Sequence, residues 1–456
     1  MLRHMRGPTS AYPSVQGLAP HGPKGPSARR GAVHAAALRC VLALVVALAS
    51  GNAAVAQTPT MAAFKTFLAG LRPEAKAAGV GDATFEAAIA GLTPDLKLPD
   101  LEFGQSKQSA QTRQAEFARP PGDYLDDVTL DRLAATGRDL AVRHSGVLAE
   151  IEQRTGVDRY TVLAIFGRET AFGAYTLPHD AIRVLATQAW VGRRKELFRR
   201  ELVLALKMLE DGVPRARMRA SWAGAMGLTQ FLPSEFFSHA RSHAGSGPAD
   251  LFTSVPDALA SAARQLEAKG WVRGEPWGFE VKRPPAVDCA LEGPPDTRPV
   301  RDWLALGLTS ARRGGVPEAL QSARAYLMSP AGAYGPSFLA LENFQVIRRY
   351  NTSDLYATFV GSLADRIAGK GGFVTPFAKV GPQTTEVIRA VQSALKDKGY
   401  AIDKIDGFIG SGTRREVGRY QRSTRRPVDC WPSAALARHL VQPGPGDGKA
   451  KRAAGG

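Results

Sequence analysis

The sequence predicts a mainly α-helical protein with a small irregular or β-containing insert and a small, separate helical unit near its C-terminus. Several long stretches repeat apolar residues at the spacing of one helix face. Residues 281–335 instead combine Pro and Gly with short apolar runs, which is typical of β or irregular structure. A chain of 456 residues is long enough for two or three domains.

Residues 1–56 are expected to be an N-terminal extension that ends in a secretory signal peptide. The apolar run at 35–50 follows Arg29 and Arg30, and Ala54-Val55-Ala56 has the A-x-A form of a cleavage site. A retained N-terminal anchor is the alternative, although the run is short for a membrane-spanning helix. We therefore expect an exported, periplasmic protein with no stable membrane span after cleavage.

The charge balance is strongly basic and favours a polyanionic partner. The chain has 59 Lys and Arg against 42 Asp and Glu, a formal net charge of +17. Six basic residues and no acidic ones lie in 1–56, so the mature chain would be near +11. Nucleic acid, an anionic membrane surface and an acidic wall polymer would all suit this charge. The export pattern and the lack of a nucleic-acid motif argue against nucleic acid.

Cysteine use is sparse and predicts no metal site. Cys40 lies within the predicted signal, which leaves Cys289 and Cys430. They could pair in an oxidising compartment, but two lone cysteines are more often unpaired, so the sequence leaves this open. No C-x-x-C pair or His/Cys cluster is present, and we expect neither a metal nor another cofactor.

The helical patterns and their boundaries divide the rest of the chain. Residues 58–370 form one unit, with amphipathic patterns at 129–155, 193–212, 255–271 and 343–369. A Gly- and Pro-containing linker at 371–379 precedes a second unit at 380–442. The Gly-rich tail at 443–456 is expected to be disordered by its composition.

One acidic residue lies on an apolar helix face. Asp158 is a suitable N-cap for a helix over 159–172, with Gly173 as its C′ residue. On this helix Glu169 shares a face with apolar residues such as Val162 and Phe166. Burial and the negative helix end would both raise the pKa of this carboxyl, as a general acid requires. A structural ion pair with an arginine is the alternative.

Two further motifs combine ligand-type polar groups with small or aromatic residues. The stretch "ASWAGAMGLTQFLPSEF" places Ser221 and Gln230 in a glycine-rich turn that a ligand could approach closely, or that only packs two helices together. The stretch "RRYNTSDLY" places Tyr350, Asn351 and Tyr356 together, a set suited to sugar rings. Its alternative is a helix N-cap at Thr352, Ser353 or Asp354 with tyrosines that only pack.

In their order, these motifs resemble the lytic murein transglycosylases of the membrane-bound B type (family-3 lytic transglycosylases). The resemblance covers 58 to about 370 and rests on the blocks "VLAIFGRETAFG", "LATQAW", "RRKELFRREL", "SWAGAMGLTQFLPS", "SVPDALASAARQLEAKGW", "GEPWG" and "NFQVIRRYNTSDLYA". It implies a lysozyme-like fold and cleavage of the β-1,4 bond between N-acetylmuramic acid and N-acetylglucosamine, with a 1,6-anhydromuramic end and no water consumed.

The resemblance also assigns roles to residues. It implies that Glu169 is the single catalytic acid and base, and that the substrate-binding residues are Ser221, Gln230, Tyr350, Asn351, Tyr356, Arg193 and Arg194. Some relatives bind calcium after the "QFLPS" block, but Asp250 is the only carboxylate in that stretch here, so no calcium is expected. Arg168 departs from the pattern, and we expect it to point away from Glu169 because adjacent helical residues are about 100° apart.

The second unit resembles a type 1 peptidoglycan-binding domain through "VQSALKDKGY", "IDGFIGSGT" and "VGRYQ". The expected partners are therefore peptidoglycan glycan strands and stem peptides, with wall-remodelling proteins as further candidates. A wall-cleaving lyase is the first hypothesis. A hydrolytic muramidase on the same scaffold and a non-catalytic wall-binding protein are the alternatives.

Overall fold

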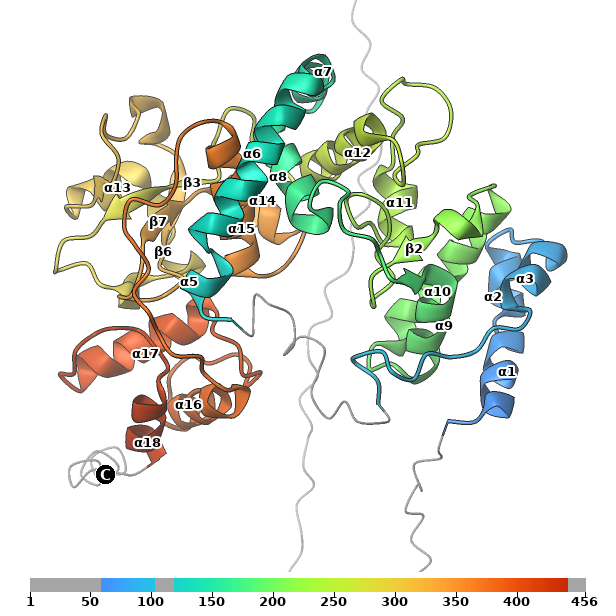
Figure 1. Ribbon diagram of the computed structural model, residues 1–456. Coiled ribbons are helices and arrows are strands. Elements are labelled where there is room, and N and C mark those ends of the chain that lie inside the picture. The colour runs from blue at the N-terminus through green and yellow to red at the C-terminus, as the bar shows by residue number, and fades with distance from the viewer. Residues whose placement is uncertain (1–58, 103–118, 442–456) are drawn as a thin grey trace, which may run out of the picture. The chain divides into compact units, whose positions relative to one another are not determined.

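The computed structural model describes residues 59–102 and 119–441, and helices make up most of its regular structure (Figure 1). The predicted mainly α-helical fold is confirmed. The predicted signal peptide within 1–56 and the predicted tail at 443–456 lie outside the described residues. Within the described ranges, no helix is both long enough and apolar enough to cross a membrane.

One group of helices packs around a hydrophobic cluster that includes Phe64, Phe85, Leu185 and Leu202. Its centre is the contact between α9 and α10, and α10 also contacts the helices that precede it in the chain. Two short antiparallel strands lie beside α9. The elements of this group are α1 (Met61–Ala69), α2 (Arg72–Ala77), α3 (Asp82–Ile89), β1 (His179–Asp180), α9 (Ala181–Val191), α10 (Lys195–Glu210), β2 (Arg219–Ala220) and α11 (Pro233–His239).

A second group surrounds α15 (Asp354–Ile367), which is buried along almost its whole length. Such a helix needs neighbours on every side, and α15 contacts α6, α8 and α14 (Figure 1). The N-cap predictions are confirmed: Asp158 caps α8, and Ser353 is the residue that caps α15. The other elements of this group are α5 (Pro121–Tyr124), α6 (Asp127–Arg143), α7 (Ser145–Thr155), α8 (Arg159–Thr170), α12 (Val255–Ala268) and α14 (Glu342–Arg348).

The predicted β-containing insert is a five-stranded sheet. Its strand order is β4-β6-β7-β3-β5, and all neighbouring strands are antiparallel. Trp303, on α13 (Val300–Ala305), is fully buried against one face of it. The sheet extends slightly beyond the predicted limits of 281–335, because its first and last strands pair with each other. The strands are β3 (Gly278–Lys282), β4 (Arg298–Pro299), β5 (Thr309–Ser310), β6 (Arg324–Met328) and β7 (Ser337–Ala340).

The C-terminal unit contains three helices with a hydrophobic cluster of their own. They are α16 (Thr385–Asp397), α17 (Ser411–Ser423) and α18 (Ala434–Val441), and Val391, Leu395 and Val417 lie in their shared core. The segment before them has no helix or strand at 371–384, yet it is bound to the preceding unit. Glu280 accepts hydrogen bonds from the backbone N–H groups of Val374 and Thr375, at 2.8 and 2.7 Å.

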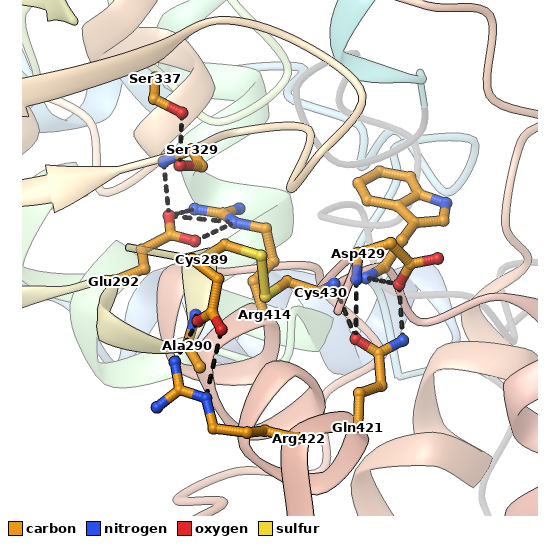
Figure 2. Close-up of a disulfide and its surroundings, with 12 residues drawn as sticks. Cys289, Ala290, Glu292, Ser329, Ser337, Arg414, Gln421, Arg422, Asp429 and Cys430 are labelled. Carbon is orange, nitrogen blue, oxygen red and sulfur yellow. Dashed lines mark hydrogen bonds and ion pairs between the residues drawn. A yellow bond between two sulfur atoms is a disulfide. The ribbon is translucent and has the colours of Figure 1, made fainter. Parts of the chain in front are cut away.

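A disulfide joins these helices to the segment beside the sheet. Cys289 and Cys430 are bonded, with their Cα atoms 6.0 Å apart, although 141 residues separate them in sequence (Figure 2). The sequence left this pairing open and favoured unpaired cysteines. That preference is wrong, because the pairing depends on a tertiary contact that no local pattern records. Arg422 on α17 and Asp288 form an ion pair next to the same disulfide.

A buried ion pair lies close to the disulfide (Figure 2). Arg414 on α17 is 1% exposed, and its Nε donates to both carboxylate oxygens of the fully buried Glu292, at 3.1 Å each. Its Nη2 also donates to Asp354 Oδ2 at 3.1 Å. Burial raises the pKa of Glu292 above its ordinary value, and the Arg414 charge opposes that shift. The C-terminal helices are thus tied to the first residue of α15 as well as to the sheet segment.

Candidate active site

Glu169 lies on the last turn of α8, on the helix face that the sequence predicts. The Asp158 carboxylate accepts the Thr161 N–H at 2.8 Å and starts the helix. Phe166 and Val162, about one and two turns before the end, are buried in the core around α15. The Glu169 side chain itself is neither fully buried nor exposed. The apolar face of α8 therefore ends at the carboxyl group of Glu169, which lies at the edge of the core.

The end of α8 differs from the prediction of a helix over 159–172. The helix ends at Thr170, because Ala171 and Phe172 both take the left-handed conformation, with φ of 49° and 59°. This reversal folds the Phe172 ring back onto Phe166, with centroids 5.5 Å apart, and onto Gly167. A Cβ at Gly167 would lie 2.5 Å from the Phe172 ring, so a larger residue there would push the ring out of this position. Gly173 is not the C′ residue, because the reversal begins two residues earlier.

Two tyrosines face the end of α8: Tyr350 lies in the segment between α14 and α15, and Tyr356 lies in the first turn of α15. The Tyr356 hydroxyl donates a hydrogen bond to Glu169 Oε1. Burial raises the pKa of Tyr356 well above its ordinary value, and the Glu169 charge adds to the shift, so this phenol remains a donor. The Tyr350 ring lies parallel to the Tyr356 ring, with centroids 6.5 Å apart, and its hydroxyl donates to the carbonyl of Thr229.

The glycine-rich loop at 219–231 forms the adjacent side of the site. Thr170, at the end of α8, donates from its hydroxyl to the Leu228 carbonyl at 2.7 Å. Gln230 has a left-handed backbone with φ of 56°, and its side-chain amide donates to the Gly227 carbonyl at 3.0 Å. The Ser221 hydroxyl accepts the Ala225 N–H at 3.2 Å within its own turn. Gln230 therefore lies beside Tyr350 and α8, whereas Ser221 stabilises the loop.

The remaining predicted residues lie in different surroundings. Asn351 is in the turn between α14 and α15, where its Oδ1 accepts the Ser353 N–H at 3.3 Å. Arg193 and Arg194 precede α10 and form ion pairs with Asp100, at 3.8 and 3.3 Å. The structure thus brings Glu169 together with the tyrosines and the Gln230 loop, while the two arginines belong to the α9–α10 turn.

Arg168 is a site residue whose contacts the sequence did not reveal. Its guanidinium carbon lies 5.4 Å from the Tyr124 ring centroid, 5.6 Å from that of Tyr356 and 5.3 Å from that of Phe359. Its Nε also donates to the Tyr124 hydroxyl at 3.0 Å. Tyr356 and Phe359 are three residues apart on α15, and this spacing of aromatic residues could have indicated a shared cation. Arg168 therefore holds the ring whose hydroxyl contacts Glu169.

A second carboxylate close to Glu169 would suit a hydrolytic mechanism, and the nearest candidates by sequence block are Asp180, Glu196 and Glu235. Asp180 caps α9 and pairs with Arg215 at 3.0 Å, and Glu196 is exposed in the first turn of α10. Glu235 on α11 accepts a hydrogen bond from Gln265 at 2.6 Å and pairs with Lys269 at 3.3 Å. Burial raises the pKa of Tyr350 well above its ordinary value, and the charges of Glu169 and Glu235 both add to this shift. Glu235 therefore affects the pKa of Tyr350 through its charge, while its carboxylate is bound by Gln265 and Lys269.

Asp250 is the carboxylate in the stretch where some relatives bind calcium, and here it is bound by groups of the protein itself. Asp250 accepts the backbone N–H groups of Phe252 and Thr253 and pairs with Arg217 at 3.2 Å. Across residues 59–102 and 119–441, no group of three or more His, Cys, Asp or Glu residues could hold a metal ion. The expectation of no calcium and no cofactor stays a prediction.

Known proteins are similar to this chain over most of the residues described above. The family described as Transglycosylase SLT domain matches residues 63–365. The Membrane-bound lytic murein transglycosylase B of Escherichia coli (strain K12) is 30% identical over 228 residues, which cover 47% of this chain and 58% of that protein. The chain therefore spans less than two thirds of that relative's length.

Two solved structures match a larger share of this chain than the Escherichia coli protein does. SltB3 from Pseudomonas aeruginosa, solved in complex with NAG-NAM-pentapeptide, is 37% identical with a TM-score of 0.74, and the match covers 83% of this chain and 99% of that one. The complex of SltB3 with NAG-anhNAM-pentapeptide gives 36% identity and a TM-score of 0.73, with the same coverage. The match at 63–365 extends over more than half of the chain, and the chain belongs to the Transglycosylase SLT domain family.

Proposed function

We propose that this protein is a lytic transglycosylase that cleaves the β-1,4 bond between N-acetylmuramic acid and N-acetylglucosamine in peptidoglycan. The observation that carries the proposal is Glu169, a carboxyl at the end of an apolar helix face that receives a hydrogen bond from Tyr356. Membership of the family supports the reaction class. The likeness to SltB3, which was solved with both NAG-NAM and NAG-anhNAM pentapeptides, supports an anhydro product.

In the proposed mechanism, one carboxyl group carries out both proton transfers. Protonated Glu169 gives its proton to the glycosidic oxygen as the bond to the anomeric carbon breaks. The substrate's acetamido group stabilises the positive carbon. Glu169 then takes the proton of the C6 hydroxyl, whose oxygen bonds to the anomeric carbon of the same sugar. Because this nucleophile is tethered, its effective concentration reaches about 10⁵ M or more when it is well oriented.

The surrounding side chains have separate roles in this proposal. Tyr356 stabilises the carboxylate that remains after the first transfer, because its phenol keeps its proton. Arg168 holds the Tyr356 ring in place. We further propose that the residues that contact the glycan or its peptide are those that the sequence predicts: Ser221, Gln230, Tyr350, Asn351, Arg193 and Arg194.

The C-terminal unit at 380–442 is proposed to bind peptidoglycan. The support is its resemblance to a type 1 peptidoglycan-binding domain and its basic charge. A buried network stabilises its central turn: the Gln392 amide donates to Asp406 at 3.0 Å and accepts the Gly407 N–H at 2.8 Å. Gly407 has φ of 82°, a left-handed turn conformation that glycine adopts without strain. Export to the periplasm is part of the same proposal, because the proposed substrate lies outside the cytoplasm.

The products of wall digestion test the proposed reaction. The mature protein is incubated with purified sacculi, and the released muropeptides are identified by mass spectrometry. We expect 1,6-anhydro ends, each lighter by one water than a hydrolysis product, and the same yield with EDTA present. Hydrated ends would identify a hydrolytic muramidase, and binding without release would identify a wall-binding protein. A clear loss of yield with EDTA would contradict the prediction that the enzyme needs no metal.

The variant Tyr356→Phe tests how Glu169 is supported. Removing a hydrogen bond to a charged group costs about 1.5–3 kcal/mol, so kcat is expected to fall about 10- to 100-fold. The measurement is the initial rate of anhydro-muropeptide release. Tyr160→Phe is the matched control, because Tyr160 packs against the same core. An unchanged rate in Tyr356→Phe would show that its hydroxyl does not act in the reaction.

A further inference from the structure

The turn that carries Tyr350 and Asn351 has an ion pair across its two ends. Arg348 is the last residue of α14 and Asp354 is the first residue of α15, so the turn consists of the residues between them. Arg348 Nε and Asp354 Oδ1 are 2.9 Å apart, and the Asp354 side chain is 7% exposed. Because the carboxylate is so little exposed, solvent and salt screen this pair only weakly. The pair therefore fixes the separation between the two ends of the turn.

The C-terminal unit holds the other oxygen of the same carboxylate. Asp354 Oδ2 accepts hydrogen bonds from Arg414 Nη2 at 3.1 Å and from the backbone N–H of Ser411 at 3.2 Å. Ser411 is the first residue of α17, and Arg414 follows it in the first turn of that helix. The guanidinium of Arg414 is in turn held by the buried carboxylate of Glu292 (Figure 2). The helices α14, α15 and α17 are therefore joined through the Asp354 carboxylate.

The first turn of α15, which begins at Asp354, places the Tyr356 hydroxyl against Glu169. The backbone N–H of Tyr356 donates to the hydroxyl of Ser353, the N-cap, at 3.3 Å, and its side-chain hydroxyl donates to Glu169 Oε1. A shift of this helix end would therefore move the hydroxyl relative to α8. A misplacement of about 1 Å in an active site can lower a rate about 10²-fold, so even a small shift would be measurable.

We infer that Asp354 and Arg414 are positioning residues for the proposed reaction, an inference that rests on the proposed function. They act through Tyr356 and not on the substrate: together they fix the first turn of α15 and thereby the hydroxyl that contacts Glu169. The C-terminal unit then has a second role besides its proposed binding of peptidoglycan, because α17 completes the support of the active site.

The double variant Glu292→Leu/Arg414→Met tests this role without leaving a buried charge unpaired. Its stability should be largely recovered, whereas its contact with Asp354 is lost. With soluble glycan strands as substrate, we expect kcat for the release of anhydro-muropeptides to fall about fivefold, with KM changed by less than about twofold. KM is retained because the Arg348 pair still closes the turn that carries the proposed glycan contacts. A merely structural role of Arg414 would restore kcat together with the stability.

Arg366→Met is the matched control at the opposite end of α15. Arg366 is buried and forms ion pairs with Asp127 and Asp131 on α6, so its loss should lower the stability of the same helix. It lies in the last turn of α15, away from Tyr356, and kcat should therefore stay at the wild-type value. An equal fall of kcat in this control would mean that any loosening of α15 slows the reaction, and the inference would be wrong.

Substitutions at Asp354 itself decide the question if the double variant does not fold. In these variants Arg414 keeps its pair with Glu292, so no buried charge is left alone. Asp354→Asn keeps an oxygen that can accept the Ser411 N–H, and kcat is expected to fall about threefold, whereas Asp354→Ala should lower it about tenfold.

A wild-type kcat would overturn the inference and leave the proposed function intact, whether or not KM rises. This holds for the folded double variant or, if it does not fold, for both Asp354 variants. If the wild-type protein releases no anhydro product, the proposed function itself fails.

Discussion

Replacing Glu169 by Gln is expected to reduce the release of anhydro-muropeptides by about 10³-fold or more. Positioned general acids and bases typically contribute about 10²–10⁴-fold, and in the proposed mechanism Glu169 is first the acid and then the base. An amide can do neither at neutral pH. Its carbonyl still accepts the Tyr356 hydrogen bond, so the fold and the binding to sacculi should be retained. Rates are measured by chromatography of the released products, and binding by cosedimentation with sacculi.

Two further Glu→Gln variants serve as comparisons for the loss of activity in Glu169→Gln. Glu196→Gln changes an exposed carboxylate in the first turn of α10 and should keep the wild-type rate. Glu235→Gln removes the second carboxylate that acts on Tyr350. If it abolished release as completely as Glu169→Gln, a two-carboxylate hydrolytic mechanism would replace the single-carboxyl proposal. A substantial residual rate in Glu169→Gln would show that the acid is another residue.

Replacing Arg414 by Met is expected to lower the free energy of unfolding by about 3–5 kcal/mol. Removing one partner of a buried ion pair leaves the other charge without compensation, and here that charge is the fully buried Glu292. Urea unfolding followed by circular dichroism measures the change. Arg438→Met, an exposed position on α18, is the control. The double variant Glu292→Leu/Arg414→Met should recover much of the loss, because it removes both charges.

The destabilisation in Arg414→Met should depend on pH with a definite sign. Burial already raises the pKa of Glu292 in the folded protein, and loss of the arginine raises it further. A carboxyl with a raised folded pKa binds its proton more readily in the folded state, so the folded state is favoured at low pH. The difference from wild type should be largest well above that pKa and shrink as pH falls. A difference that is independent of pH, or no larger than that of Arg438→Met, would contradict this account.

The sequence could predict the features that depend on local pattern. Glu169 could be assigned to the apolar face of its helix because the 3.6-residue period and the Asp158 cap are both local. The end of that helix could not be predicted, because the left-handed turn at Ala171 depends on the fit of Phe172 against Gly167. The tyrosine motif was recognisable, but the stacking of Arg168 on Tyr356 required α8 and α15 to be placed side by side.

Features formed by distant segments were beyond the reach of sequence patterns. In the sequence, Arg414 is one of several arginines in a basic helix. The fold shows that it is buried against Glu292, which is 122 residues away. The position of Ser411 beside Asp354 likewise depends on how the C-terminal helices dock. The sequence described the C-terminal unit as separate, whereas its buried contacts join it to the helix that carries Tyr356.

The covalent link between Cys289 and Cys430 also constrains how the protein is made. The two thiols are 141 residues apart in sequence, so the bond can form only after the strands of the sheet and α17 have been synthesised. Under the proposed export, the segment with Cys40 is removed, and Cys289 and Cys430 then have one intramolecular pairing and no wrong one to correct. Maturation would then need an oxidant such as a thiol oxidase but no disulfide isomerase, and a reducing compartment would leave the last step of assembly undone.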